Sequence, residues 1–167
     1  ISEKNFLKSL PKREIICGYA EILKHSLISN KIFYNFLTKN ISKILRLQSP
    51  FIEKAIFESC KIKKKVVEKD EKEKNLRKIL NFGHTFAHAY EATMGYSNKL
   101  NHGEAVLLGM NTALKFSKKN NYVNNNDYSS ILNHMITSKL PNNLKKYFSI
   151  KHVNKILDVL LRKNFTR

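Results

Sequence analysis

Polar side chains recur at helical spacing near the middle of the chain. They are Arg77, Asn81, His84, His88 and Glu91. Steps of four, three, four and three positions would place all of them in one narrow stripe of a single α-helix. Burying such a stripe is costly unless each group is paired or coordinates something. The spacing therefore predicts either a solvated surface or one wall of a polar pocket.

Imidazoles and carboxylates of the kind that bind zinc gather around this stripe. The possible donors are His84, His88, His102, Glu21, Glu91 and Glu104. Zinc sites in enzymes use such side chains and leave the fourth position to water or substrate. His84 and His88, at i and i+4, could clamp an ion from one helix. For any one of these histidines a purely structural role is at least as common.

Basic residues could add an anion site to such a pocket. Lys24 follows Glu21 by one turn, Lys63 lies near the charged end of a predicted helix, and Arg77 begins the stripe. Together they would suit a phosphate or carboxylate ligand, although solvent exposure is the ordinary state of each lysine. The sequence contains no phosphate-binding glycine loop and no serine nucleophile elbow. The residue types alone predict a helical domain with a Glu/His/His metal site and an anionic substrate.

The elements that must position these groups are helices. Only 5 Gly and 3 Pro occur in 167 residues, of which 42% are hydrophobic, and this composition favours an all-α bundle forming one domain over residues 1–167. Apolar periodicity predicts an extended entry over 1–11 and then roughly seven or eight helices. Their expected ranges are 11–28, 32–37, 41–47, 51–74, 75–94, 102–119, 128–138 and 152–161.

Charge and cysteine content limit which partners and which cellular compartment are expected for this chain. The formal charge of +18 would suit nucleic acid or a phosphorylated substrate, but Lys, Asn and Ile are heavily used throughout, which favours compositional drift. Cys17 and Cys60 have no framework spacing, so a reduced cytosolic protein is expected. No apolar run approaches the ~20 residues of a membrane span. Because the chain begins abruptly at Ile1 without a methionine, we expect it to be a fragment of a longer protein.

Three stretches, which follow one another in the same order as in the family, resemble segments of 3-dehydroquinate synthases. They are LPKREIICGYAEILK (10–24), KKKVVEKDEKEKNLRKILNFGHTFAHAYE (63–91) and NHGEAVLLGM (101–110). The motifs are long and spaced as in that family, and the resemblance covers residues 5–110 well. The remainder matches only in its helical character.

The resemblance implies a fold and an activity. Family members have an N-terminal α/β NAD-binding domain followed by a helical domain, so this chain would be the helical part of a two-domain cytoplasmic enzyme that forms homodimers at full length. The family converts 3-deoxy-D-arabino-heptulosonate 7-phosphate to 3-dehydroquinate and phosphate, in the second step of the shikimate pathway. The expected cofactors are NAD and Zn²⁺ (or Co²⁺). No nucleic-acid or membrane partner is expected, and the chain alone should be inactive.

The resemblance also implies roles for individual residues. Glu21, His84 and His102 become the metal ligands, which replaces the pairing of His84 with His88. His88 becomes a pocket residue that acts on the substrate and on proton transfer. The expected substrate contacts are Lys24, Lys63, Arg77 and Asn81, with Glu73 as a supporting or proton-handling group. The expected contacts to NAD are Phe6, Leu7, Lys8 and Ser9.

Some features depart from the family pattern and leave rivals open. Ala87 replaces a glycine, and the family's C-terminal phosphate-contacting lysine has only a loose counterpart in Lys163. One rival is another sugar-phosphate cyclase acting on a different heptulose phosphate, against which Asn81 and His88 argue. The others are a basic helical module that binds nucleic acid, and an inactive remnant of the enzyme.

Overall fold

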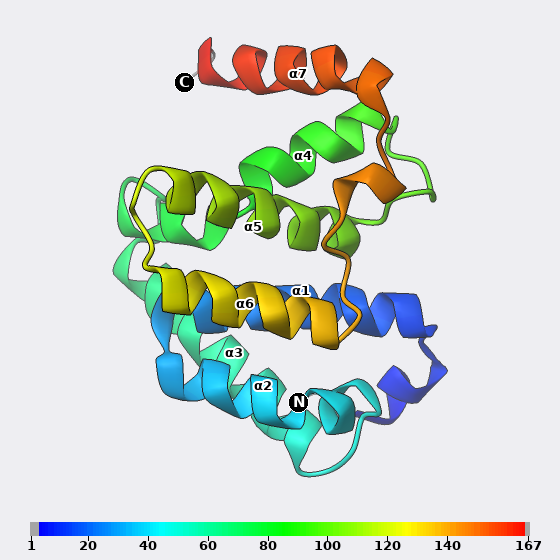
Figure 1. Ribbon diagram of the computed structural model, residues 1–167. Coiled ribbons are helices and arrows are strands. Elements are labelled where there is room, and N and C mark those ends of the chain that lie inside the picture. Colours follow the sequence, from blue (N-terminus) through cyan, green and yellow to red (C-terminus); the bar gives the residue numbers. More distant parts are fainter. Residues whose placement is uncertain (1–3, 166–167) are drawn as a thin grey trace. The chain divides into compact units, whose positions relative to one another are not determined.

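The computed structural model contains only helices in the part of the chain that it describes, residues 4–165, with side chains described over 6–162 (Figure 1). Within that part, seven α-helices are joined by loops and four short 3-10 helices. The prediction of an all-α fold is confirmed. The chain forms two compact units, Ile1–Asn81 and Phe82–Arg167. That residues 1–167 act as one metal- and substrate-binding domain stays a prediction.

The first unit is built on three helices that pack against one another. They are α1 (Lys12–Ser29), α2 (Lys31–Leu45) and α3 (Phe51–Lys69), preceded by η1 (Lys4–Ser9) and followed by η2 (Leu76–Asn81). Their shared core includes Leu23, Leu37 and Ala55, all fully buried. Burial of this apolar area is the main contribution to the stability of the unit.

Two predictions for the first half of this unit were wrong. Residues Lys4–Ser9 form a 3-10 helix where an extended entry was expected. The two short helices expected over 32–37 and 41–47 are one continuous helix, α2. The side chain of Asn40 donates to the carbonyl oxygen of Phe36 one turn earlier (2.9 Å), so this polar residue is accommodated without a break.

The second unit is built on four helices. They are α4 (His84–Thr93), α5 (His102–Lys119), α6 (Asn125–Thr137) and α7 (Val153–Phe165), with η3 (Leu144–Lys146) and η4 (Ile150–His152) before α7. Helix α4 packs against both α5 and α7, and α5 packs against α6. Helix α5 contributes most to the core of this unit, and its residues Val106, Leu107 and Leu108 are fully buried.

The helix predicted over 75–94 does not exist as one element. Leu76–Asn81 form the 3-10 helix η2, and α4 begins at His84. Between them Gly83 has φ +81°, a left-handed conformation that glycine adopts far more readily than other residues. The polar stripe is therefore divided: Arg77 and Asn81 belong to the first unit, and the two histidines and Glu91 belong to the second.

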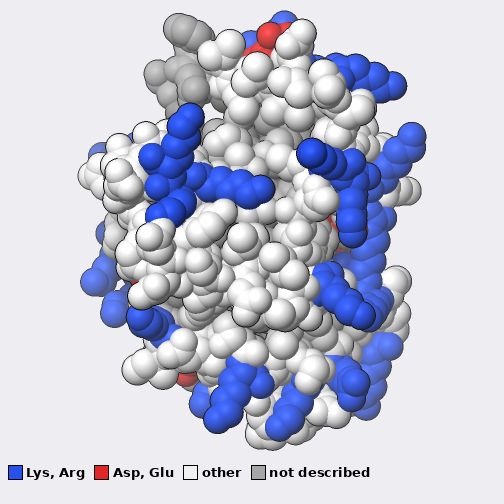
Figure 2. Space-filling view, viewed as in Figure 1, with Lys and Arg blue, Asp and Glu red and all other residues white. Residues whose placement is uncertain are grey.

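Surface charge and hydropathy add little about partners. On the face shown in Figure 2, Lys and Arg side chains are spread over much of the outline and are densest along the right edge, and few Asp or Glu atoms are visible. This distribution agrees with compositional drift. Among the helices of the described residues, none combines the length and the hydropathy of a membrane span.

Candidate functional site

Helix α1 carries an ion pair that includes a buried lysine. The Nζ of Lys24 donates to Oε2 of Glu21 over 2.8 Å, one turn apart. Lys24 is only 3% exposed, and burial lowers its pKa, which the hydrogen bond and charge of Glu21 partly offset. A buried ammonium with one carboxylate partner retains donors for an anionic or hydroxyl-bearing ligand.

Lys63 on α3 adds a second positive charge to this region of the first unit. Its charge also lowers the pKa of Lys24, so the packing of α1 against α3 holds the two ammonium groups close enough to repel each other. Like charges held together by a scaffold are stabilised when an anion binds between them. That the two lysines contribute to one anion site stays a prediction.

Asp70 organises the loop that follows α3. Its carboxylate accepts hydrogen bonds from the backbone N–H groups of Lys74 (2.9 Å), Asn75 (2.8 Å) and Arg77 (2.9 Å). These bonds lower the pKa of Asp70. They also explain why α3 ends at Lys69, earlier than the predicted residue 74. An aspartate directly after a helix commonly bonds to nearby backbone N–H groups. Asp70 could have been recognised in this way from the sequence, but it lies in a run of charged residues that looked like a continuing helix.

Two predicted substrate contacts, Arg77 and Asn81, are hydrogen-bonded to the loop that follows α3. The Nδ2 of Asn81 donates to Oε1 of Glu73 over 2.7 Å, and the Nη1 of Arg77 donates to the carbonyl oxygen of Glu71 over 2.7 Å. The amide of Asn81 is thereby oriented by Glu73, and the action of either residue on a substrate stays a prediction. Of these residues Arg77 is also bonded to Asp70, whose carboxylate accepts from its backbone N–H.

Replacing Asp70 by Asn should loosen this loop. The charge that strengthens its hydrogen bonds is lost, so amide exchange at Lys74, Asn75 and Arg77 should speed up by roughly tenfold. The carboxylate's folded-state pKa is depressed, so its contribution to stability is present above about pH 4 and is lost as pH falls through the folded-state pKa. Hydrogen exchange followed by NMR at neutral and acidic pH measures both effects.

Glu71→Gln is the matched control, because it removes the same charge from the next position while its backbone carbonyl remains. Exchange at the three amides should then stay at the wild-type rate. Wild-type rates in Asp70→Asn would contradict the organising role of Asp70.

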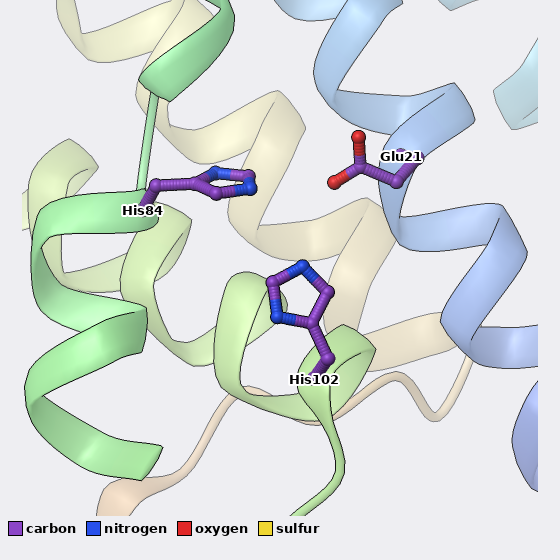
Figure 3. A group of neighbouring side chains, drawn as sticks. All are labelled: Glu21, His84 and His102. Carbon is purple, nitrogen blue, oxygen red and sulfur yellow. The ribbon is translucent and has the colours of Figure 1, made fainter. Parts of the chain in front are cut away.

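Three imidazoles converge in the second unit. His84 lies in the first turn of α4, His88 one turn later, and His102 at the first position of α5. The ring centroids are 5.6 Å apart for His84 and His88, and 5.4 Å apart for His84 and His102. Figure 3 shows the rings of His84 and His102 turned toward each other from the two helices. His84 is thus the shared member of both possible pairings.

Glu104 has a capping function that accounts for its place in the motif. The backbone N–H of Glu104 donates to Oδ1 of Asn101 (2.9 Å), and the backbone N–H of Asn101 donates to Oε2 of Glu104 (3.0 Å). This capping box starts α5 and sets the position of His102 at its first residue. Glu104 was one of the possible metal donors in the sequence, but its side chain caps α5 instead.

The residues expected to contact NAD lie in η1. Phe6 is 76% exposed, and Lys8 and Ser9 are also exposed. Leu7 instead lines an apolar cavity of about 270 Å³ within the first unit, together with residues of α1, α2 and α3. The side chain of Lys163 lies outside the described residues, as does the start of the chain at Ile1.

The sequence of this chain matches one protein-family model and several curated proteins. Residues 18–163 match the family model described as 3-dehydroquinate synthase C-terminal. A 3-dehydroquinate synthase of Pelagibacter ubique (strain HTCC1062) is 58% identical over 169 residues, covering 100% of this chain and 46% of the relative. One of Aliivibrio fischeri (strain MJ11) is 42% identical over 141 residues, covering 84% of this chain and 39% of the relative.

A solved structure has the same fold. It is ValA, a 2-epi-5-epi-valiolone synthase from Streptomyces hygroscopicus subsp. jinggangensis 5008, determined with NAD⁺ and Zn²⁺ bound. The TM-score is 0.81 at 21% sequence identity, over 96% of this chain and 43% of ValA. The fold of this chain therefore matches part of ValA over nearly the whole length of the chain.

Proposed function

Because this chain belongs to the family of 3-dehydroquinate synthase C-terminal domains, we propose that it supplies the metal site and most of the substrate site of that enzyme. The reaction converts 3-deoxy-D-arabino-heptulosonate 7-phosphate to 3-dehydroquinate and phosphate in the cytoplasm, as a step of the shikimate pathway. The chain spans less than half the length of the curated relatives it matches. The observation that carries the proposal is 58% identity across the whole chain.

The metal ligands in this proposal are Glu21, His84 and His102, the side chains drawn in Figure 3. Each offers one donor atom, a carboxylate oxygen or an imidazole nitrogen, and two imidazoles with one carboxylate form a recurrent donor set of catalytic zinc. This chemistry fits Zn²⁺ or Co²⁺, and ValA has Zn²⁺ bound. When bound, the ion would polarise substrate hydroxyls as a Lewis acid.

The remaining polar residues would bind and orient the substrate. Lys24 and Lys63 supply positive charge for its carboxylate or phosphate, and Arg77 offers a planar donor group for the same oxyanions. Asn81, held by Glu73, would donate to or accept from a hydroxyl. These groups act by positioning and electrostatics, which contribute to the rate when they are fixed before the substrate arrives.

His88 is the proposed residue for proton transfer. It stands one turn beyond His84 on the same face of α4, and the two rings are 5.6 Å apart. An imidazole at this position can act as a general acid or base. If His88 acts on the substrate, His84 and His102 are the two histidine ligands of the metal, as the family resemblance implies.

NAD, which is bound in ValA, would supply hydride transfer in this enzyme. Phe6, Leu7, Lys8 and Ser9 would contact NAD from this chain, and the exposed ring of Phe6 offers apolar surface for that purpose. The phosphates of NAD would be held by an N-terminal α/β domain of the same enzyme. The full-length enzyme would form a homodimer.

Complementation tests this function. The purified chain, mixed with the N-terminal domain of the Pelagibacter relative, Zn²⁺ and NAD⁺, should release phosphate from the heptulosonate phosphate, whereas the chain alone should release none. His88→Ala in the pair should lower the rate by about 10² to 10⁴, the usual contribution of a positioned acid–base group.

A folded, metal-loaded pair that releases no phosphate would contradict the proposal. Release from a heptulose phosphate that lacks the carboxylate would instead assign the chain to another sugar-phosphate cyclase. Salt-sensitive binding of nucleic acid by a metal-free chain would favour the basic binding module.

A further inference from the structure

Glu91 is a polar residue of the stripe to which the proposed function gives no role. It lies in α4, one turn beyond His88, and its side chain is only 12% exposed. Its Oε1 is 3.1 Å from Nδ1 of His102, the first residue of α5. The contact joins two helices of the same unit, so it is a tertiary contact within one compact body.

The chemistry of this contact decides which ring nitrogen carries the proton. An ionised carboxylate only accepts hydrogen bonds, so the nitrogen facing it must be an N–H donor. For neutral His102 this selects the tautomer with hydrogen on Nδ1 and the lone pair on Nε2. A metal binds a lone pair, so Nε2 becomes the ligand atom.

We propose that Glu91 is a positioning residue that fixes the tautomer and ring orientation of His102 for metal binding. The inference rests on the proposed role of His102 as a metal ligand, and it deepens that role. Metal-binding histidines commonly donate their second nitrogen to a carboxylate or backbone carbonyl, which makes the ring a better and better-aimed ligand.

The surroundings of His102 make such a restraint necessary. The side chain of His102 is 46% exposed, so packing alone leaves its ring room to rotate. The capping box fixes only the backbone at this position. A carboxylate fixed in a neighbouring helix lowers the entropy that the ring must lose when a metal binds.

The other histidine of the pair has a similar arrangement. The Nδ1 of His84 faces the backbone carbonyl oxygen of Phe82 at 3.5 Å, the outer limit of a hydrogen bond. Both rings therefore direct Nδ1 to an oxygen acceptor, one from the backbone and one from a side chain. Of the two acceptors only Glu91 can be removed by substitution, which makes it the one to test.

The first measurement needs no metal. In the metal-free chain at pH ~8, where an ordinary histidine is neutral, ¹⁵N NMR should show His102 with its proton on Nδ1. In Glu91→Ala the ring should shift toward the other tautomer, which predominates in unrestrained histidine. Glu104→Gln is the control: it removes the same charge two residues from His102, keeps the capping box, and should leave the tautomer unchanged.

The second measurement is zinc affinity by competition with a chelator. Glu91→Ala and Glu91→Gln should weaken Zn²⁺ binding by roughly 10- to 100-fold, the usual effect of removing a partner of a ligating histidine. Glu104→Gln should have a smaller effect, and the melting temperature of each variant shows whether the fold is retained.

The outcomes separate this inference from the proposed function. If the wild-type chain binds Zn²⁺ and His102→Ala loses it, while the Glu91 variants keep wild-type affinity and tautomer, the inference is overturned and the metal site stands. If Glu91→Ala changes the tautomer and the affinity together, the inference is supported. If the wild-type chain binds no Zn²⁺, the metal assignment fails and the inference fails with it.

Discussion

Replacing His84 by Ala should abolish zinc binding by this chain, whereas replacing His88 by Ala should leave most of it. His84 is the member of the imidazole group that neighbours both His88 and His102, so every proposed two-histidine pairing needs it. Loss of a ligand should exceed the 10- to 100-fold effect of losing a ligand's supporting partner, so we expect a reduction of at least about 100-fold. Equilibrium dialysis with metal analysis measures the difference.

The two substitutions control for each other. Both remove an imidazole from adjacent turns of α4 and both introduce alanine, which favours a helix. Circular dichroism should show the same helix content in both variants. An equal loss of zinc from both would support the clamp formed by His84 and His88, and would contradict the assignment of His102 as the second histidine ligand.

Replacing Gly109 by Ala should destabilise the second unit strongly. A Cβ at this position would overlap the carbonyl oxygen of Gly83 and would lie 2.9 Å from the backbone nitrogen of Ala87. Both atoms belong to the backbone at the start of α4, so relief requires α4 and α5 to move apart. Overpacking of this kind costs about 1 to 3 kcal/mol, and the upper end is expected here because no side chain can rotate away.

The same substitution should also weaken zinc binding, because the distance between α4 and α5 sets the distance between His84 and His102. Gly18→Ala is the matched control. It lies within α1, a Cβ there would meet nothing within 4 Å, and alanine should raise stability by about 0.5 to 1 kcal/mol. Urea unfolding measures both variants. A Gly109→Ala chain as stable as the wild type would contradict the close packing of α4 against α5.

Much of the local structure was predictable because it depends on residues close in sequence. The apolar periodicity indicated that the segments of α1, α3 and α5 are helical, and the start of α5 was correctly predicted at His102. Donor types and motif order were sufficient to identify the family and a set of ligands to test. Helix ends were less predictable: the end of α3 at Lys69 depended on Asp70 bonding to amides up to seven residues away.

The sequence by itself determined that this protein is helical, which residues could bind a metal or an anion, and which family it resembles. Only the tertiary structure decided how those residues are grouped. Gly83 adopts a left-handed conformation that divides the stripe, and Gly109 permits α5 to approach it closely. The contact of Glu91 with His102 joins two helices across a turn. Periodicity describes one helix at a time, whereas these features come from contacts between elements, which no single helical repeat contains.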